Sequence, residues 1–156
     1  MIINDKTKRI LFDAGITRLV EWLDNKGWSI TFGYCETDAI YPSDKLVTIS
    51  TRQGLEKRLY SLLHECGHIL IQVNEEGYIN QYPATAKMNC YASHKQLERS
   101  PKYKVDVISE EIEAWKRGKS LAKRLDIHTD EESYNNLMSK CVYSYIVWAN
   151  DEVEAT

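Results

Sequence analysis

The residues best suited to chemistry are His64, Glu65 and His68, which together form an H-E-x-x-H motif. The apolar residues between positions 55 and 73 recur with a helical period, which predicts that the motif lies on one amphipathic helix. Because positions i and i+4 lie one above the other on a helix, the two imidazoles can share a divalent metal ion. Glu65 lies about 100° further round the axis and can reach a water on that ion without ligating it. This spacing is typical of zinc-dependent hydrolases.

A catalytic zinc site needs a third protein ligand, and three glutamates in a later helical pattern are candidates: Glu110, Glu111 and Glu113. Glu111 shares its helical face with small and apolar residues, namely Ala114, Trp115, Gly118, Leu121 and Ala122. A carboxylate on such a face is costly unless it is paired or binds a metal. Glu113 is followed by basic residues at i+3 and i+4, which is typical of a solvated face, and Glu110 is also expected to be exposed. We therefore expect Glu111 to be the third ligand, with Glu110 as the second choice.

The motif helix has predictable ends and one unusual interior residue. Ser50 and Gln53 fit a capping box, so the helix is expected to begin directly after the preceding strand. Gly67 costs roughly 1 kcal/mol relative to alanine inside a helix, and its presence predicts that another backbone comes close there. Gly77 is expected to end the helix or the turn that follows it.

The order of the other patterns predicts an α+β fold. We expect an N-terminal helix at 7–26, strands at 28–34 and 46–50 with a loop at 36–44 between them, and later helices at 106–125 and from 129 onward. A second capping-box pattern, of Thr129 and Glu132, marks the start of the last helix. Periodicity is lost in 78–105, which predicts an irregular insertion with room for a short helix at 84–97. The tail at 151–156 is expected to be frayed.

Composition limits the function classes. The 156 residues are 43% hydrophobic, which predicts a single domain, 1–156, with a real core. The net charge of −3 gives no basic excess, so a nucleic-acid partner is not expected. Four cysteines without a C-x-x-C pair indicate reduced thiols and a cytoplasmic location. The absence of an apolar run near 18 residues argues against a membrane partner.

With these residues in view, the chain resembles small zincins of the gluzincin type, and in layout it is most similar to the ImmA/IrrE metallopeptidases. That family has a His-Glu-x-x-His helix and a later helix that reads roughly Glu-x-Glu-Ala-Asn-x-Phe-Ala. The first is matched by His64, Glu65 and His68. The second is matched by Glu111, Glu113 and Ala114, while Trp115, Arg117 and Gly118 stand at the Asn, Phe and Ala positions. SprT-like proteases resemble the chain more distantly, because their third ligand is a histidine, for which His94 and His128 are the choices here.

The resemblance implies a minimal zincin-like domain in which Zn²⁺ is held by His64, His68 and a downstream glutamate. It also implies that Glu65 is the catalytic base of a metallopeptidase acting on a protein or peptide substrate, often a regulatory protein. The alternative is a catalytically idle zincin-fold protein that binds a partner, such as a regulator or inhibitor of a phage or mobile element. A further side chain should stabilise the oxyanion, and the sequence leaves several candidates open: Tyr78, Tyr82, Tyr91, Tyr103 and His94.

Overall fold

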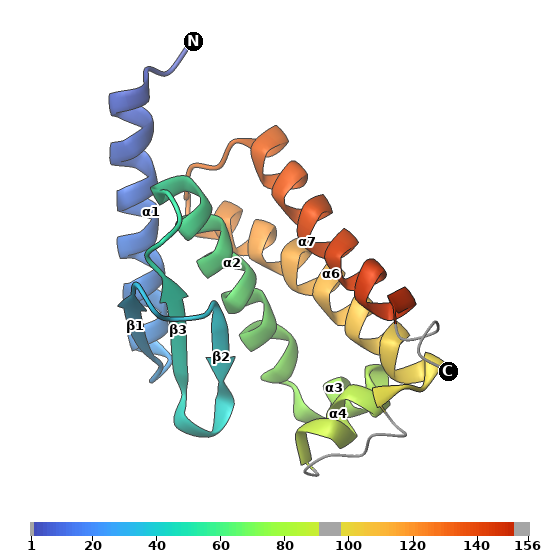
Figure 1. Ribbon diagram of the computed structural model, residues 1–156. Coiled ribbons are helices and arrows are strands. Elements are labelled where there is room, and N and C mark those ends of the chain that lie inside the picture. The colour runs from blue at the N-terminus through green and yellow to red at the C-terminus, as the bar shows by residue number, and fades with distance from the viewer. Residues whose placement is uncertain (1, 91–97, 152–156) are drawn as a thin grey trace.

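A computed structural model describes residues 2–90 and 98–151 of the chain, and it has the expected mixed α+β class (Figure 1). In chain order the elements are α1 (Asp5–Asn25), β1 (Ser29–Gly33), β2 (Ala39–Tyr41), the 3-10 helix η1 (Pro42–Asp44), β3 (Leu46–Ser50), α2 (Leu55–Gln72), α3 (Glu75–Gln81), α4 (Pro83–Cys90), α6 (Pro101–Arg124) and α7 (Glu131–Asp151). Within these described residues, no helix combines the length and the apolar character needed to cross a bilayer.

The three strands form a small mixed sheet in the order β1-β3-β2. β3 pairs in parallel with β1 and antiparallel with β2, and its central residues Val47, Thr48 and Ile49 are buried. β2 is an edge strand that lies within 36–44, where a loop was expected, so that expectation was wrong. A strand of three residues is too short to show an alternating pattern. Its pairing with β3 is a tertiary contact, which local sequence does not predict.

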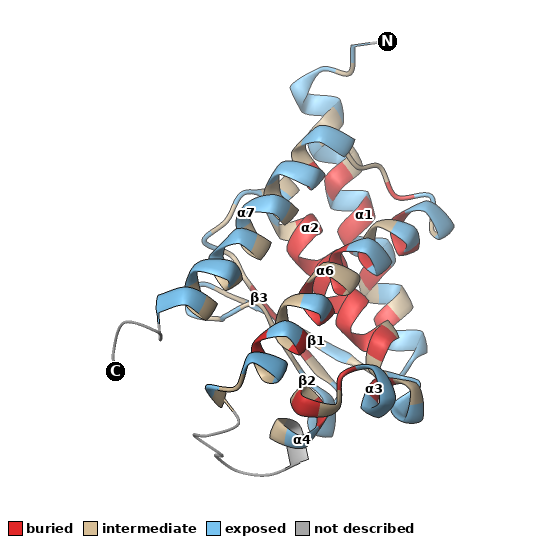
Figure 2. Ribbon diagram, turned by 90° about the vertical axis from the view of Figure 1, so that its right-hand side faces the viewer, coloured by how far each residue is buried: buried red, intermediate tan, exposed pale blue. Residues whose placement is uncertain are grey.

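Helix α2 is the centre of the molecule. Twelve of its eighteen residues are buried, since α1 and the sheet contact one side and α6 contacts another (Figures 1 and 2). The main core consists largely of aliphatic and aromatic side chains from α1, β3, α2 and α6, among them Leu19, Leu23, Ile49, Leu62 and Leu121. Cys66 is fully buried in this core, on α2. The motif is therefore held on the most enclosed helix of the fold.

Two glycines allow α2 and α6 to pack with their backbones in close contact. A Cβ added at Gly67 would clash with the backbone carbonyl of Ala114, and one added at Gly118 would lie 2.5 Å from the carbonyl oxygen of Leu63. The sequence prediction that another backbone approaches Gly67 is confirmed. Each helix contributes one glycine that faces the backbone of the other helix. The two backbones are therefore in close contact at two points, about one helical turn apart.

The ends of α2 differ from those expected. Gly54 is the N-cap and the helix begins at Leu55, so the capping box of Ser50 and Gln53 is wrong. The Gln53 side chain instead donates to the carboxylate of Asp38 and accepts from the Ser61 hydroxyl, which ties the helix start to the sheet. The helix ends at Gln72, before Gly77, and that glycine lies inside α3. α1 ends at Asn25, within one residue of the expected end, and Gly27 follows with φ +77° before β1 begins.

The segment expected to be irregular is largely helical where it is described. α3 and α4 have seven and eight residues, too few for a clear helical period, and they are stabilised by packing of Tyr78, Tyr82 and Ala86 around Ala114 of α6. The expected helix at 84–97 agrees with α4 in its first half, and 91–97 lie outside the described residues.

Both later helices begin at caps that the sequence analysis misplaced. α6 starts at Pro101, five residues before the expected position, because the Ser100 side chain accepts from the Tyr103 amide. α7 starts where expected, but its cap is Asp130, whose carboxylate accepts from the Ser133 amide, and not Thr129.

The Gly67→Ala substitution should destabilise the fold by roughly 1–3 kcal/mol, because the added methyl group overpacks the contact between α2 and α6. Urea unfolding followed by circular dichroism measures this change. Gly54→Ala is the matched control, since its Cβ meets nothing within 4 Å and it should cost at most about 1 kcal/mol. Equal unfolding free energies for Gly67→Ala and the unsubstituted protein would contradict the close packing.

Candidate metal centre

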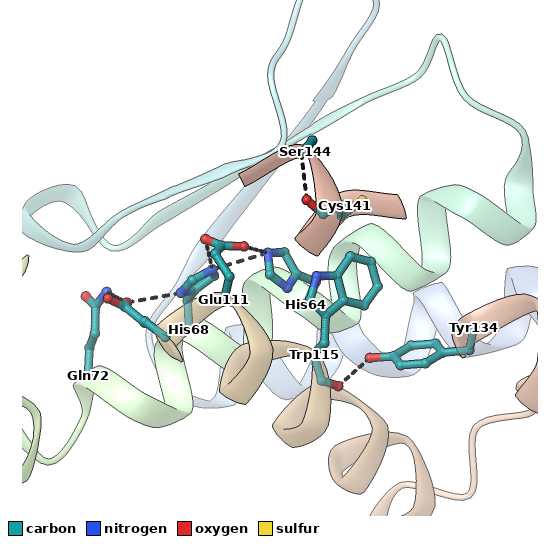
Figure 3. A network of polar contacts seen from close by, with 9 residues as sticks. His64, His68, Gln72, Glu111, Trp115, Tyr134, Cys141 and Ser144 are labelled. Atoms are coloured by element: carbon teal, nitrogen blue, oxygen red, sulfur yellow. Dashed lines mark hydrogen bonds and ion pairs between the residues drawn. The ribbon is translucent and has the colours of Figure 1, made fainter. Parts of the chain in front are cut away.

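His64 and His68 of α2 and Glu111 of α6 point toward one another (Figure 3). The Nε2 atom of His64 lies 3.0 Å from Oε2 of Glu111, and Nε2 of His68 lies 3.2 Å from Oε1 of the same carboxylate. The two Nε2 atoms are 3.2 Å apart. All three side chains are largely buried, and their donor atoms converge on one point. This group could hold a metal ion.

The convergence follows from the close approach of α2 and α6. Glu111 precedes Ala114 by three residues, so its carboxylate lies about one turn from the point where α6 touches Gly67. Burial by itself would raise the pKa of the Glu111 carboxyl, but hydrogen bonds from His64 and His68 lower it to about 2. The carboxylate is therefore charged in the folded protein, as a metal ligand must be.

Glu110, the second choice for the third ligand, has a different place. Its Oε1 lies 3.2 Å from Nδ1 of His68, on the side of the imidazole away from Glu111, and it also accepts from the Gln72 amide. Its other oxygen accepts from the Tyr78 hydroxyl at 3.1 Å. The expectation that Glu110 is exposed is wrong, because α3 and the end of α2 cover it. A carboxylate on the second nitrogen of an imidazole fixes the ring and its tautomer, leaving Nε2 free for a metal.

His64 is oriented by stacking. The Trp115 ring lies against its imidazole with centroids 4.4 Å apart and an interplanar angle of 24° (Figure 3). Nδ1 of His64 and Nε1 of Trp115 are both buried and have no hydrogen-bond partner among the described residues. Trp115 occupies the position where the ImmA/IrrE pattern has asparagine, and here a flat apolar contact holds the first histidine.

Glu65 lies beside the group in a cavity of about 290 Å³. Side chains from β2 and the residue before it, and from α2, α3, α4, α6 and α7, line it, among them Asp38, Ile40, His64, Glu65, Glu111 and Tyr145. Burial raises the pKa of the Glu65 carboxyl above its ordinary value, and the neighbouring His64 and His68 act against that rise. A carboxyl with a raised pKa beside a possible metal position is suited to accept and return a proton near neutral pH.

Tyr145 of α7 is the residue of this cavity that sequence reasoning missed. Its phenol lines the same space as His64 and Glu65, and burial, followed by the charge of Glu111, raises its pKa. The only available signal was its position on the half-buried stripe of the last helix, which does not indicate what the stripe faces. Of the tyrosines named from sequence, Tyr78 donates to Glu110, while Tyr103 packs on Trp148 away from the cavity.

The remaining candidates lie elsewhere or outside the described part. Glu113 pairs with Arg117 at 2.9 Å on the outer face of α6, as the i+4 spacing predicted. His128 packs against Phe12 of α1, and it is not part of the group. The Tyr82 hydroxyl is buried but does not line the cavity. Tyr91 and His94 lie outside the described residues.

Comparisons of the chain with protein-family models, with curated proteins and with solved structures found no match.

Proposed function

We propose that the protein is a zinc metallopeptidase that hydrolyses a peptide bond in a protein or peptide substrate. The observation that carries the proposal is the meeting of His64, His68 and Glu111 around one point, with Glu65 beside them in an open cavity. Two imidazoles and one carboxylate, with a fourth side open, form the donor set of catalytic zinc sites.

The donor spacing supports a small tetrahedral ion. Ligand bonds of 2.0–2.1 Å at tetrahedral angles place neighbouring donors about 3.4 Å apart. The two Nε2 atoms are 3.2 Å apart, and each lies 3.0–3.2 Å from a different oxygen of the Glu111 carboxylate, so small side-chain adjustments suffice for a shared ion. Calcium, with more ligands and longer bonds, fits this set poorly. When bound, zinc lowers the pKa of a coordinated water toward ~7 and polarises the substrate carbonyl.

Each neighbouring side chain then has a role. Glu65 accepts the proton of the attacking water and delivers it to the leaving amine, for which its raised pKa is suited. Tyr145 lines the same cavity, and its hydroxyl donates a hydrogen bond to the oxyanion as charge develops there. Glu110 does not contact the substrate, and it holds the His68 ring through Nδ1.

The edge of the sheet supports a peptide as substrate. Ala39 and Ile40 of β2 line the cavity, and among the described strands β2 is paired only with β3, which leaves its other edge open. An extended peptide that pairs with this edge would present its backbone to Glu65 and the metal position.

The Glu65→Gln variant should keep its zinc and lose cleavage by about 10²-fold or more, because the amide cannot accept the proton. Elemental analysis reports the zinc, and mass spectrometry of a random peptide library reports cleavage. His68→Ala is the paired control and should lose both. Unchanged cleavage in Glu65→Gln would refute the assigned base. A protein that binds zinc and cleaves nothing would instead support the idle, partner-binding alternative.

Tyr145→Phe should retain zinc and substrate KM while kcat falls by about 10²-fold, since the hydrogen bond to the transition state is removed. Tyr143→Phe, on the exposed side of the same helix, is the matched control and should leave kcat unchanged. A kcat unaffected by Tyr145→Phe would remove this residue from the mechanism.

Zinc uptake at pH 7 should release about one proton per ion, because a ligating imidazole must be neutral. Burial tends to lower the pKa of His68, but Glu110 and Glu111 together raise it to about 10, so the metal-free protein carries that proton at pH 7. The apparent affinity for zinc should therefore rise as the pH increases toward 10. Titration calorimetry in buffers of different ionisation enthalpy counts the protons, and a count of zero would contradict a charged His68.

A further inference from the structure

We propose that a groove between one end of the sheet and helices α2 and α3 binds the part of the substrate that precedes the scissile bond. The groove selects a large apolar side chain with an acidic residue N-terminal to it. The inference rests on the proposed peptidase function and adds to it the chemical class of the substrate. The groove has a volume of about 760 Å³, within the range of about 300–1,000 Å³ that is typical of ligand sites.

The groove is continuous with the metal cavity. Ile40, Gln72 and Tyr78 line both spaces, so one extended chain can occupy the two together. The groove is lined by the connection between β2 and β3, by the end of α2 and by α3. These segments lie at the same end of the molecule in Figure 1. A substrate that enters it therefore passes directly to Glu65 and Glu111.

The walls are apolar and partly uncovered. Trp28 and Pro42 contribute from the sheet side, while Ile69, Val73 and Ile79 contribute from the helices. Val73 is 76% exposed and Ile79 is 47% exposed, although both are branched aliphatic residues beside a cavity. Covering them with an apolar side chain of the substrate removes that surface from water, which favours binding.

The charge at the far end of the groove is positive. Lys26 and Lys45 line it, with Glu75 as the acidic residue among its lining residues. Both lysines are exposed, and among the described residues neither forms an ion pair with a carboxylate. Lys26 lies over the Trp22 ring at 4.9 Å, which positions its charge without neutralising it. An acidic side chain is the complement to this pair.

The direction of β2 decides on which side of the scissile bond these residues lie. β2 runs from Ala39, which lines the metal cavity, to Tyr41, and η1 then leads to Lys45 at the groove. A peptide paired antiparallel to β2 runs the opposite way, so its N-terminal part lies in the groove and its later residues reach the metal position.

Cleavage profiling tests the assignment. A randomised dodecapeptide library treated with zinc-loaded protein should give products enriched in large apolar residues before the cut, with Asp or Glu further N-terminal. In the double variant Lys26→Glu/Lys45→Glu the acidic preference should change to Lys or Arg, and the zinc content should stay the same. Lys6→Glu/Lys140→Glu has the same net charge at exposed positions outside the groove, and it should keep the original preference.

Binding provides a readout that is independent of turnover. A fluorescein-labelled decapeptide with Asp-Glu-Phe-Leu ahead of an alanine tract should bind zinc-loaded Glu65→Gln protein at least tenfold more tightly than its Lys-Arg-Phe-Leu counterpart, and the double charge reversal should invert that order. Cleavage without an acidic preference, a preference on the C-terminal side, or a preference that the reversal does not move would overturn the groove assignment while leaving the peptidase proposal intact. Cleavage of no peptide at all would overturn both.

Discussion

The site depends on one contact, the approach of the α2 and α6 backbones at Gly67 and Gly118. Side chains at both positions would hold the helices further apart, and Glu111 would no longer reach His64 and His68. The contact also buries the Glu111 carboxylate, and hydrogen bonds from the two imidazoles offset the cost of burying its charge. Packing and chemistry are therefore linked, because the same helix pair that builds the core also assembles the polar group.

The imidazoles have acidic and polar partners on two sides. Glu111 lies between the two Nε2 atoms, while Glu110, Tyr78 and Gln72 form a network on the far side of His68. His64 has no such polar support among the described residues and is held by the Trp115 ring. Buried carboxylates without partners would destabilise the fold strongly, so the network serves stability as well as orientation. The cavity beside the group is also lined by Glu65, Tyr145 and the edge strand β2.

Much of this arrangement could be predicted from local sequence. The i, i+4 histidines, the helical period around them and the small-residue face of Glu111 are short-range patterns, and they correctly predicted α2, the body of α6 and the proximity of Glu111 to both histidines. The zinc and the peptidase activity remain proposals that the experiments above test. The short elements β2 and α3 were missed because three residues in a strand, or seven in a helix, do not establish a period.

The sequence by itself determined which side chains could bind a metal and that a second backbone must lie against Gly67. Only the tertiary structure decided the different contacts of Glu110 and Glu111. Adjacent residues on a helix point about 100° apart, and the packing of α2 and α3 sets which side chains each glutamate contacts. It also decided that Tyr145 enters the cavity, that β2 forms the open edge, and that a groove with two lysines continues from it. These features depend on contacts between residues far apart in the chain, which local periodicity does not encode.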